Sequence, residues 1–220
     1  WLDDFNACEA KVMYNELFSK LLKALNNIGK KPIMAYGGYE SIILCNTNSP
    51  ARLYGVAQSV GYGEYRAITP VGGGMPVNKY YFLPTHCRMR FDDVARILSE
   101  HGYFSASKSE KEHALDYYRD ICNCGICHEI IRDDINGFSA YNDSIPYTVK
   151  TRNGILTKNR PTTDATLIAA IHFLNCKVFE WNYIENENLS TVLDNLKSCY
   201  AQYQPKLVGH INKWCEIYGK

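Results

Sequence analysis

Cys122-Asn123-Cys124-Gly125-Ile126-Cys127 places three thiols within six consecutive residues. A spacing this short suits a shared metal ion far better than disulfide bonds. Thiolates are typical ligands of zinc, which takes four donors in a tetrahedral arrangement. We therefore predict a structural Zn²⁺ site on Cys122, Cys124 and Cys127, with a fourth ligand from elsewhere in the chain. The alternative is a set of three free, buried cysteines.

The fourth ligand is predicted to be His172, which lies in the apolar run Ile171-His172-Phe173 of an expected helix. An unpaired imidazole is costly to bury, and binding a metal would offset that cost. Cys176, one helical turn later, and His128, next to the motif, are the rival ligands. His172 could instead be a core histidine bonded to a carbonyl group. Four protein ligands leave no open position, so we expect a structural metal.

The composition indicates an ordinary soluble, globular chain. Of its 220 residues, 46% are apolar and 21% are charged, and the net charge is +1, so nothing global points to nucleic acid. The most apolar stretches, such as Thr166–Phe173, are far shorter than the roughly 20 residues that span a bilayer, so we expect no membrane partner. Cysteines grouped for a metal favour a reducing, cytoplasmic location. Trp1 at the start suggests a piece of a longer chain.

The first 120 residues alternate between expected strands and helices joined by glycine-rich turns. The expected strands are 31–36, 53–60, 79–83 and 103–104, and the expected helices are 3–27, 39–45 and 91–101. This order is typical of parallel βα units and predicts an α/β fold. Ligands of such folds bind at the carboxyl ends of the strands, where the glycine turns and the segment Pro84–Arg90 would lie.

The pattern changes after residue 120. Helices are expected over residues 162–181 and 189–203, and the stretch Asn136–Pro161 is polar and turn-rich. Four basic residues lie in that stretch, with Tyr147 within reach: Lys150, Arg152, Lys158 and Arg160. Basic side chains beside an aromatic ring suit a nucleic-acid backbone. The alternative is a flexible, solvated loop.

The metal motif and its surroundings resemble the tRNA-guanine transglycosylase family. Its members are (β/α)8 barrels of the TIM type with an inserted zinc subdomain that carries Cys-x-Cys-x-x-Cys and a later His. They exchange a guanine for a 7-deazaguanine base in tRNA or, in one branch, in DNA. The segments that match in order are Ile33–Gly38, Gln58–Glu64, Lys79–Pro84, Gly102–Phe104 and Ala170–Leu174.

The resemblance implies a fold, a substrate site and partners. Residues 1–120 would be βα units of part of such a barrel, and residues 121–220 would be the zinc-binding subdomain with closing C-terminal helices. The partners would be tRNA or DNA and a 7-deazaguanine base. The residues implied in substrate binding are Gly37, Gly38, Ser59, Val60 and Gly61.

The sequence departs from the family in four places. The N-terminal half of the barrel, with a catalytic aspartate, has no counterpart, and the gap from Cys127 to His172 is longer. Tyr36 stands where the family has a base-reading glutamine, and Ser105-Ala106-Ser107 stands where the family has its nucleophilic aspartate. Base exchange needs a carboxylate nucleophile and a second group that moves a proton. The catalytic residues are therefore unknown.

Three functions remain open. The first is a transglycosylase whose missing barrel half belongs to a longer chain or to a second chain, in a homodimer or a heterodimer. The second is a non-catalytic, zinc-bearing subunit that binds nucleic acid or acts as a scaffold. The third is a zinc-stabilised α/β domain of unrelated function.

Several polar residues near the expected strand ends also have two interpretations. His86, Arg88 and Arg90 could bind a phosphate or sugar, or they could lie in a solvated loop. Asp92 and Asp93 suit a helix N-terminus. Asp116 and Asp120 are expected on a solvated segment, and we assign a catalytic role to none of these carboxylates.

Overall fold

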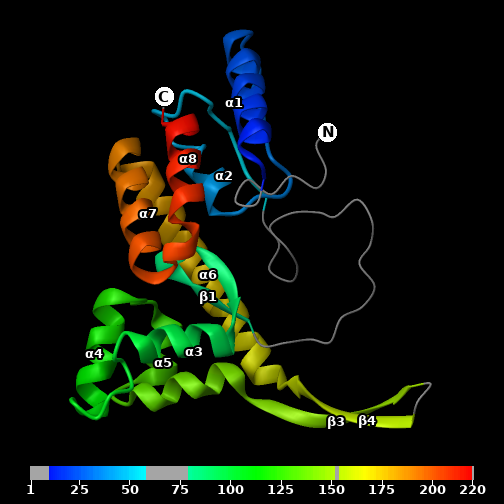
Figure 1. Ribbon diagram of the computed structural model, residues 1–220, viewed down its shortest axis with the longest axis vertical. Helices are drawn as coiled ribbons and strands as arrows, with labels where there is room; N and C mark the ends of the chain where they lie inside the picture. Colours follow the sequence, from blue (N-terminus) through cyan, green and yellow to red (C-terminus); the bar gives the residue numbers. More distant parts are fainter. Residues whose placement is uncertain (1–9, 58–78, 152–153, 220) are drawn as a thin grey trace. The chain divides into compact units, whose positions relative to one another are not determined.

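A computed structural model describes residues 10–57, 79–151 and 154–219 (Figure 1). The fold is mixed α/β, as expected. The described residues form two compact units. The first unit comprises residues 10–57, 84–87 and 177–219, and the second comprises residues 79–83, 88–151 and 154–176. The division expected at residue 120 stays a prediction.

The first unit is helical. Its elements are α1 (Val12–Asn27), α2 (Tyr39–Ile43), the end of α6 (Thr163–Asn186), α7 (Leu189–Tyr203), a 3₁₀ turn η3 (Pro205–Leu207) and α8 (Val208–Tyr218). Apolar residues recur every three or four positions in α7, and this face packs into a core that includes Trp214 and Tyr218. The helix expected over 189–203 is therefore confirmed, as are α2 and the long α6. The helix expected over 3–27 is present as α1, but it begins only at Val12, because residues 10 and 11 lie outside it.

The strands expected over 31–36 and 53–60 are much shorter in the described part of the chain. A single parallel bridge joins Met34 to Val56. The Met34 amide donates to the Gly55 carbonyl at 3.0 Å, and the Ala57 amide donates to the Met34 carbonyl at 2.9 Å. Pro32 has no amide hydrogen, and the backbone turns into α2 after Gly37, which leaves room for little more pairing.

The second unit contains the remaining strands. Its elements are β1 (Lys79–Phe82), β2 (Cys87–Arg90), α3 (Phe91–Glu100), α4 (Glu110–Asp120), α5 (Gly125–Ile131), the 3₁₀ helix η2 (Ile135–Asn142), β3 (Ser144–Thr151), β4 (Gly154–Pro161) and the start of α6; a 3₁₀ turn, η1 (Leu83–Thr85), follows β1. The strand at 79–83 and the helix at 91–101 are confirmed. Phe91, Val94 and Leu98 form the buried face of α3.

The strand expected at Tyr103-Phe104 is wrong, because these residues form a turn after α3. A helix, α4, follows where a solvated segment was expected. Ser109 and Glu112 begin it with a capping box: the Ser109 amide donates to Glu112 Oε2 at 2.9 Å, and the Glu112 amide donates to Ser109 Oγ at 3.3 Å. This Ser-x-x-Glu pattern was present in the sequence and predicts a helix start.

The basic stretch is not a loop. β3 and β4 form an antiparallel hairpin whose register runs from Ser144 opposite Pro161 to Thr151 opposite Gly154. Figure 1 shows this hairpin extending away from the helices of its unit. Ile145, Tyr147 and Val149 occupy alternate positions, a pattern that predicts a strand despite the polar composition of the stretch.

The described residues form no closed barrel. Their two sheets, β1–β2 and β3–β4, have two strands each. Within the described part of the chain, no helix combines the length and the apolar character needed to cross a bilayer.

Candidate metal centre

Four side chains of the second unit converge as the sequence predicts. Cys122 follows α4, Cys124 caps the start of α5, Cys127 lies in α5, and His172 lies in α6. Their ligand atoms all lie within 4.8 Å of one another. His172 Nδ1 lies 3.3 Å from the Cys124 sulfur, 3.5 Å from the Cys127 sulfur and 4.0 Å from the Cys122 sulfur. Tetrahedral zinc would place a sulfur and a nitrogen ligand roughly 3.6 Å apart, so this donor set fits a metal ion.

A backbone carbonyl orients His172. Its imidazole is fully buried, and Nε2 donates to the Tyr81 carbonyl at 2.8 Å. That bond directs the lone pair of Nδ1 toward the three sulfurs, just as a hydrogen bond from the other ring nitrogen orients metal-binding histidines. The Tyr80 ring stacks on the imidazole with centroids 4.4 Å apart. His172 therefore makes the hydrogen bond to a carbonyl that is expected of a core histidine, and it also has the geometry of a metal ligand.

The two rival ligands are less well placed. The Cys176 sulfur approaches His172 Nε2 to 3.6 Å and the Cys122 sulfur to 3.9 Å, but it is not one of the four mutually close donors. His128 is exposed, bonds to the Asn123 side chain and stacks on Tyr118, so its ring is engaged outside the cluster.

Tyrosine hydroxyls surround Cys127, which the sequence did not predict. Tyr117 Oη lies 3.4 Å from the Cys127 sulfur and Tyr141 Oη lies 3.5 Å from it. The Tyr80 hydroxyl bonds in turn to that of Tyr117. Burial raises the pKa of both Tyr117 and Tyr141, so these hydroxyls keep their protons and can donate to a thiolate.

Burial and mutual hydrogen bonds shift the pKa values of the four groups in the cluster. Burial raises the pKa of the Cys127 thiol. The hydrogen bond between Cys122 and Cys124 raises the pKa of Cys122 and lowers that of Cys124. Burial lowers the pKa of His172, but its hydrogen bonds to Cys124 and Cys127 raise the pKa to about 10 overall. Three buried thiolates side by side therefore require a cation, and a divalent metal would supply that charge.

The predicted substrate glycines have local structural roles. A Cβ on Gly37 would lie 2.5 Å from Ser41 Oγ and 2.9 Å from Val56 Cγ1, so only glycine fits there. Gly38 caps the start of α2. Ser59, Val60 and Gly61 lie outside the described residues, as does Arg152.

The hairpin register divides the described basic residues between two faces. Lys158 lies opposite Tyr147, and Arg160, two residues further on, shares that face, with its guanidinium 6.0 Å from the Tyr147 ring. Lys150 lies opposite Ile155, on the other face. All three basic side chains are exposed. The expected basic surface is therefore a pair of cations beside one tyrosine, with Lys150 facing away.

His86 does not lie in a solvated loop. Its Nδ1 lies 2.7 Å from Glu180 Oε1, and Lys177 Nζ donates to Glu180 Oε2 at 2.8 Å. The ring stacks on Tyr39 with centroids 3.4 Å apart, and the backbone has φ +52°. Burial raises the pKa of Glu180, but bonds to His86 and Lys177 hold it below its usual value. The sequence suggested neither Glu180 nor Lys177 as a partner. Arg88, in the second unit, packs over the Phe173 ring at 3.8 Å.

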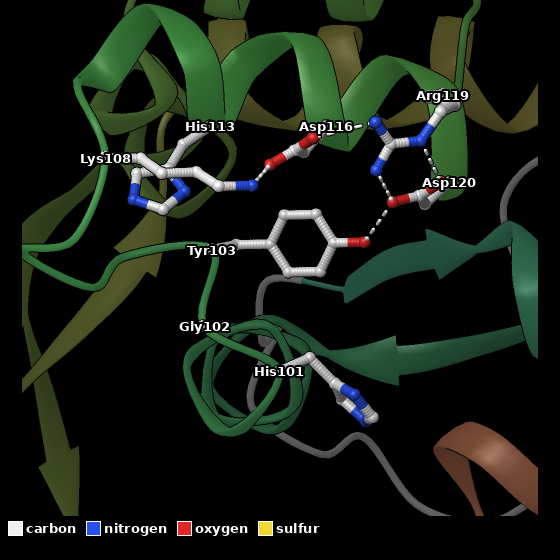
Figure 2. Close-up of a pocket in the computed structure, with 8 residues that line it drawn as sticks. All are labelled: His101, Gly102, Tyr103, Lys108, His113, Asp116, Arg119 and Asp120. Carbon is white, nitrogen blue, oxygen red and sulfur yellow. Dashed lines mark hydrogen bonds and ion pairs between the residues drawn. The ribbon is translucent and has the colours of Figure 1, made fainter.

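A polar pocket is lined by the turn that follows α3 and by residues of α4 (Figure 2). It encloses about 180 Å³ and is lined by His101, Gly102, Tyr103, Lys108, His113, Asp116, Arg119 and Asp120. Lys108 Nζ donates to Asp116 at 2.5 Å and lowers the pKa of its carboxyl. Arg119 bonds to both aspartates, and the Tyr103 hydroxyl donates to Asp120 at 3.2 Å. Asp116 and Asp120 therefore line a pocket as ion-paired carboxylates.

The chain matches no protein-family model, no curated protein and no solved structure. Function must therefore be inferred from the metal centre and the surfaces around it.

Proposed function

We propose that Cys122, Cys124, Cys127 and His172 hold a structural zinc ion in a transglycosylase-like protein that exchanges guanine for a 7-deazaguanine in tRNA or DNA. The convergence of these four donors supports the proposal, because three close cysteines and a distant histidine are the features on which the resemblance depends. Residues 1–120 would then be βα units of a (β/α)8 barrel whose missing half belongs to a longer chain or to a second chain.

Zinc is the metal that this donor set favours. Three thiolates and one imidazole select a soft or borderline cation with tetrahedral preference, whereas magnesium and calcium prefer oxygen ligands. When bound, the zinc would supply the positive charge that allows all three thiols to ionise. The chain's own residues hold the site in place: Tyr81 orients the histidine, and the tyrosine hydroxyls bond to Cys127.

Metal analysis of the purified protein tests this centre directly. We expect elemental analysis by mass spectrometry to find one zinc ion per chain. Replacement of zinc by cobalt(II) should give intense thiolate-to-cobalt absorption bands together with the visible bands of a tetrahedral ion. A metal-free protein that takes up neither ion would refute the site.

The Tyr147 face of the hairpin is proposed to contact the nucleic acid. A phosphate could lie on Lys158 and Arg160 while a base or sugar packs on the ring. We expect Lys158→Glu to weaken RNA or DNA binding at least tenfold and to reduce the salt dependence, with Lys150→Glu, on the other face, as the matched control. Equal losses from both substitutions would count against this face.

The activity is tested by incubating the protein with guanine-containing tRNA or DNA and a 7-deazaguanine base. In base exchange, a carboxylate oxygen bonds to the sugar C1′ as the bond from C1′ to guanine breaks, and a general acid supplies a proton to the departing base. We expect a denaturation-resistant adduct and incorporation of the new base. The site of the adduct would identify the nucleophile.

A non-catalytic subunit is the second candidate, and the turn at Ser105 favours it. The Ser105 and Ser107 hydroxyls bond to each other at 2.6 Å, and the His113 imidazole donates through Nε2 to the Ser105 carbonyl at 2.8 Å rather than bonding to either hydroxyl. The carboxylates of the neighbouring pocket, Asp116 and Asp120, are both engaged in ion pairs. A zinc-loaded, folded protein that binds tRNA or DNA but forms no adduct would support this second function.

A further inference from the structure

Helix α1 exposes an apolar stripe to solvent, although its Leu22 is buried in the core of the first unit. The side chains that it buries include Asn15 and Ser19, which are 1% and 4% exposed, and the Tyr218 hydroxyl donates to the Asn15 carbonyl at 3.1 Å on that side. Met13, Leu17 and Leu21 are 56%, 55% and 44% exposed. Residues four positions apart share one side of a helix, so these three form an apolar stripe in water. A surface helix normally buries its apolar stripe against the protein core.

A groove runs beside the stripe. It encloses about 230 Å³ between α1 and the segment 32–36, with Phe18, Leu21 and Leu25 on one wall and Ile33 and Tyr36 on the other. Ile33 is 71% exposed, the largest value among the groove's exposed apolar side chains. We call the surface formed by Met13, Leu17, Leu21, Ile33 and Tyr36 the α1 face.

The groove is bordered by an open strand edge. Met34 uses its amide and carbonyl to pair with Gly55 and Ala57. In a parallel pair, alternate residues direct these groups to the opposite edge, and here those residues are Ile33 and Ala35. Neither makes a hydrogen bond within the described part of the chain. An unpaired edge beside an apolar groove is a template for another strand.

The described residues 10–57, which include the α1 face, carry more basic than acidic side chains. Residues 10–57 contain six basic side chains, Lys11, Lys20, Lys23, Lys30, Lys31 and Arg52. The same residues contain two acidic ones, Glu16 and Glu40, and Glu40 is buried. A partner that covers the apolar stripe would therefore meet a basic border and gain from acidic side chains of its own.

We propose that the α1 face binds an extended segment of another polypeptide, which adds as a strand to the edge at Ile33 and Ala35. The segment would place apolar side chains over Leu17 and Leu21 and acidic ones toward the lysines. A bilayer could not satisfy the open amide and carbonyl groups, because hydrocarbon offers no hydrogen bonds. A second copy of this chain would bring two basic borders together. The inference does not depend on the metal or on base exchange.

The probe is a fluorescein-labelled peptide of twelve residues with alternating glutamate and valine, and fluorescence anisotropy measures its binding to the whole chain. Ala35→Pro removes the outward amide hydrogen and none of the bonds formed by Met34, and Ala35→Ser is the matched control that keeps that hydrogen. We expect Ala35→Pro and Leu17→Asp each to weaken binding at least tenfold, and Ala35→Ser to change it less than twofold. Amide exchange at Ile33 and Ala35 should slow when the peptide binds.

Several outcomes would overturn the proposal. One is that the acidic peptide fails to bind, and another is that a lysine–valine peptide binds equally well. A third is that Ala35→Pro leaves binding unchanged in a protein whose thermal unfolding matches the wild type. Binding of phosphatidylserine vesicles that Leu17→Asp abolishes would assign the α1 face to a membrane instead. Dimerisation in sedimentation experiments that the same substitution abolishes would assign it to a second copy. Normal zinc content and base exchange beside any of these results would leave the proposed function standing.

Discussion

Replacing His172 by alanine distinguishes a metal ligand from an ordinary core histidine. Without metal, the substitution removes the bond to the Tyr81 carbonyl and the stacking on Tyr80. A buried carbonyl left unpaired costs about 1–3 kcal/mol, and a lost ring contact costs about 0.5–1.5 kcal/mol. A purely structural His172 therefore predicts a loss of roughly 2–4 kcal/mol in the free energy of unfolding, whether or not a chelator is present.

A ligand predicts a larger, metal-dependent loss. Zinc binds small four-ligand sites with roughly 10–16 kcal/mol, which is about 3 kcal/mol for each ligand on average. With zinc present, His172→Ala should therefore lower the free energy of unfolding by about 5–7 kcal/mol. With a chelator present, only the roughly 2–4 kcal/mol of the packing and carbonyl bond should be lost.

The assay is denaturant unfolding of wild type and His172→Ala, each with zinc and with a chelator. The four free energies of unfolding form a thermodynamic cycle, analysed in the same way as a double-mutant cycle. Cys176→Ala is the matched control from the same helix face, and its cost should not depend on the chelator. Equal losses with and without chelator for His172→Ala would refute the ligand assignment. A chelator-dependent loss for Cys176→Ala alone would make Cys176 the fourth ligand.

Three further substitutions, one of them with a matched control, test the fold and the buried ion pair. Ser109→Ala removes the capping box of α4 and should lower the free energy of unfolding by about 1 kcal/mol in a chemical denaturation curve. Gly137→Ala would bring a Cβ to 2.4 Å from the Ile130 carbonyl oxygen. We expect it to lower the melting temperature through a loss of about 1–3 kcal/mol, whereas Gly125→Ala, with nothing within 4 Å, should leave it unchanged or slightly higher. Glu180→Gln should destabilise the protein at pH 7 by about 3–5 kcal/mol, because it breaks a buried pair. The folded state lowers the pKa of Glu180, so the stabilisation by its carboxylate is fully present above the unfolded-state pKa of about 4.3 and is lost as the pH falls through the folded-state pKa. If the difference in free energy of unfolding between wild type and variant stayed constant down to pH 3, this reasoning would be contradicted.

The candidate metal centre could be predicted from the sequence because the spacing of its three cysteines is local information. Cys122, Cys124 and Cys127 lie within six residues, and their chemistry as ligands does not depend on the rest of the fold. The distant ligand could be inferred because a histidine in an apolar helix needs a partner. Helices α3, α6 and α7 could be predicted for a similar reason, since the spacing of apolar residues within one segment reveals its buried face.

Interpretation from the sequence failed where pairing between segments decides the structure. The hairpin register, and not composition, places Lys150 on the face opposite Lys158. The strand expected at Tyr103-Phe104 has suitable residues, but no neighbouring described strand pairs with it. β-structure needs a partner strand as well as a suitable sequence, so propensity alone is a weak guide.

By itself, then, the sequence predicted the four residues of the candidate metal site and the position of the long helices, because ligand spacing and helical periodicity are properties of short segments. Only the tertiary structure decided that tyrosine hydroxyls from α4 and η2 surround Cys127 and that Glu180 binds His86, 94 positions away in the chain. It alone also revealed that α1 exposes Leu17 and Leu21 while Leu22 is buried. These features arise from contacts between segments remote in sequence, and no local pattern encodes which segments will meet.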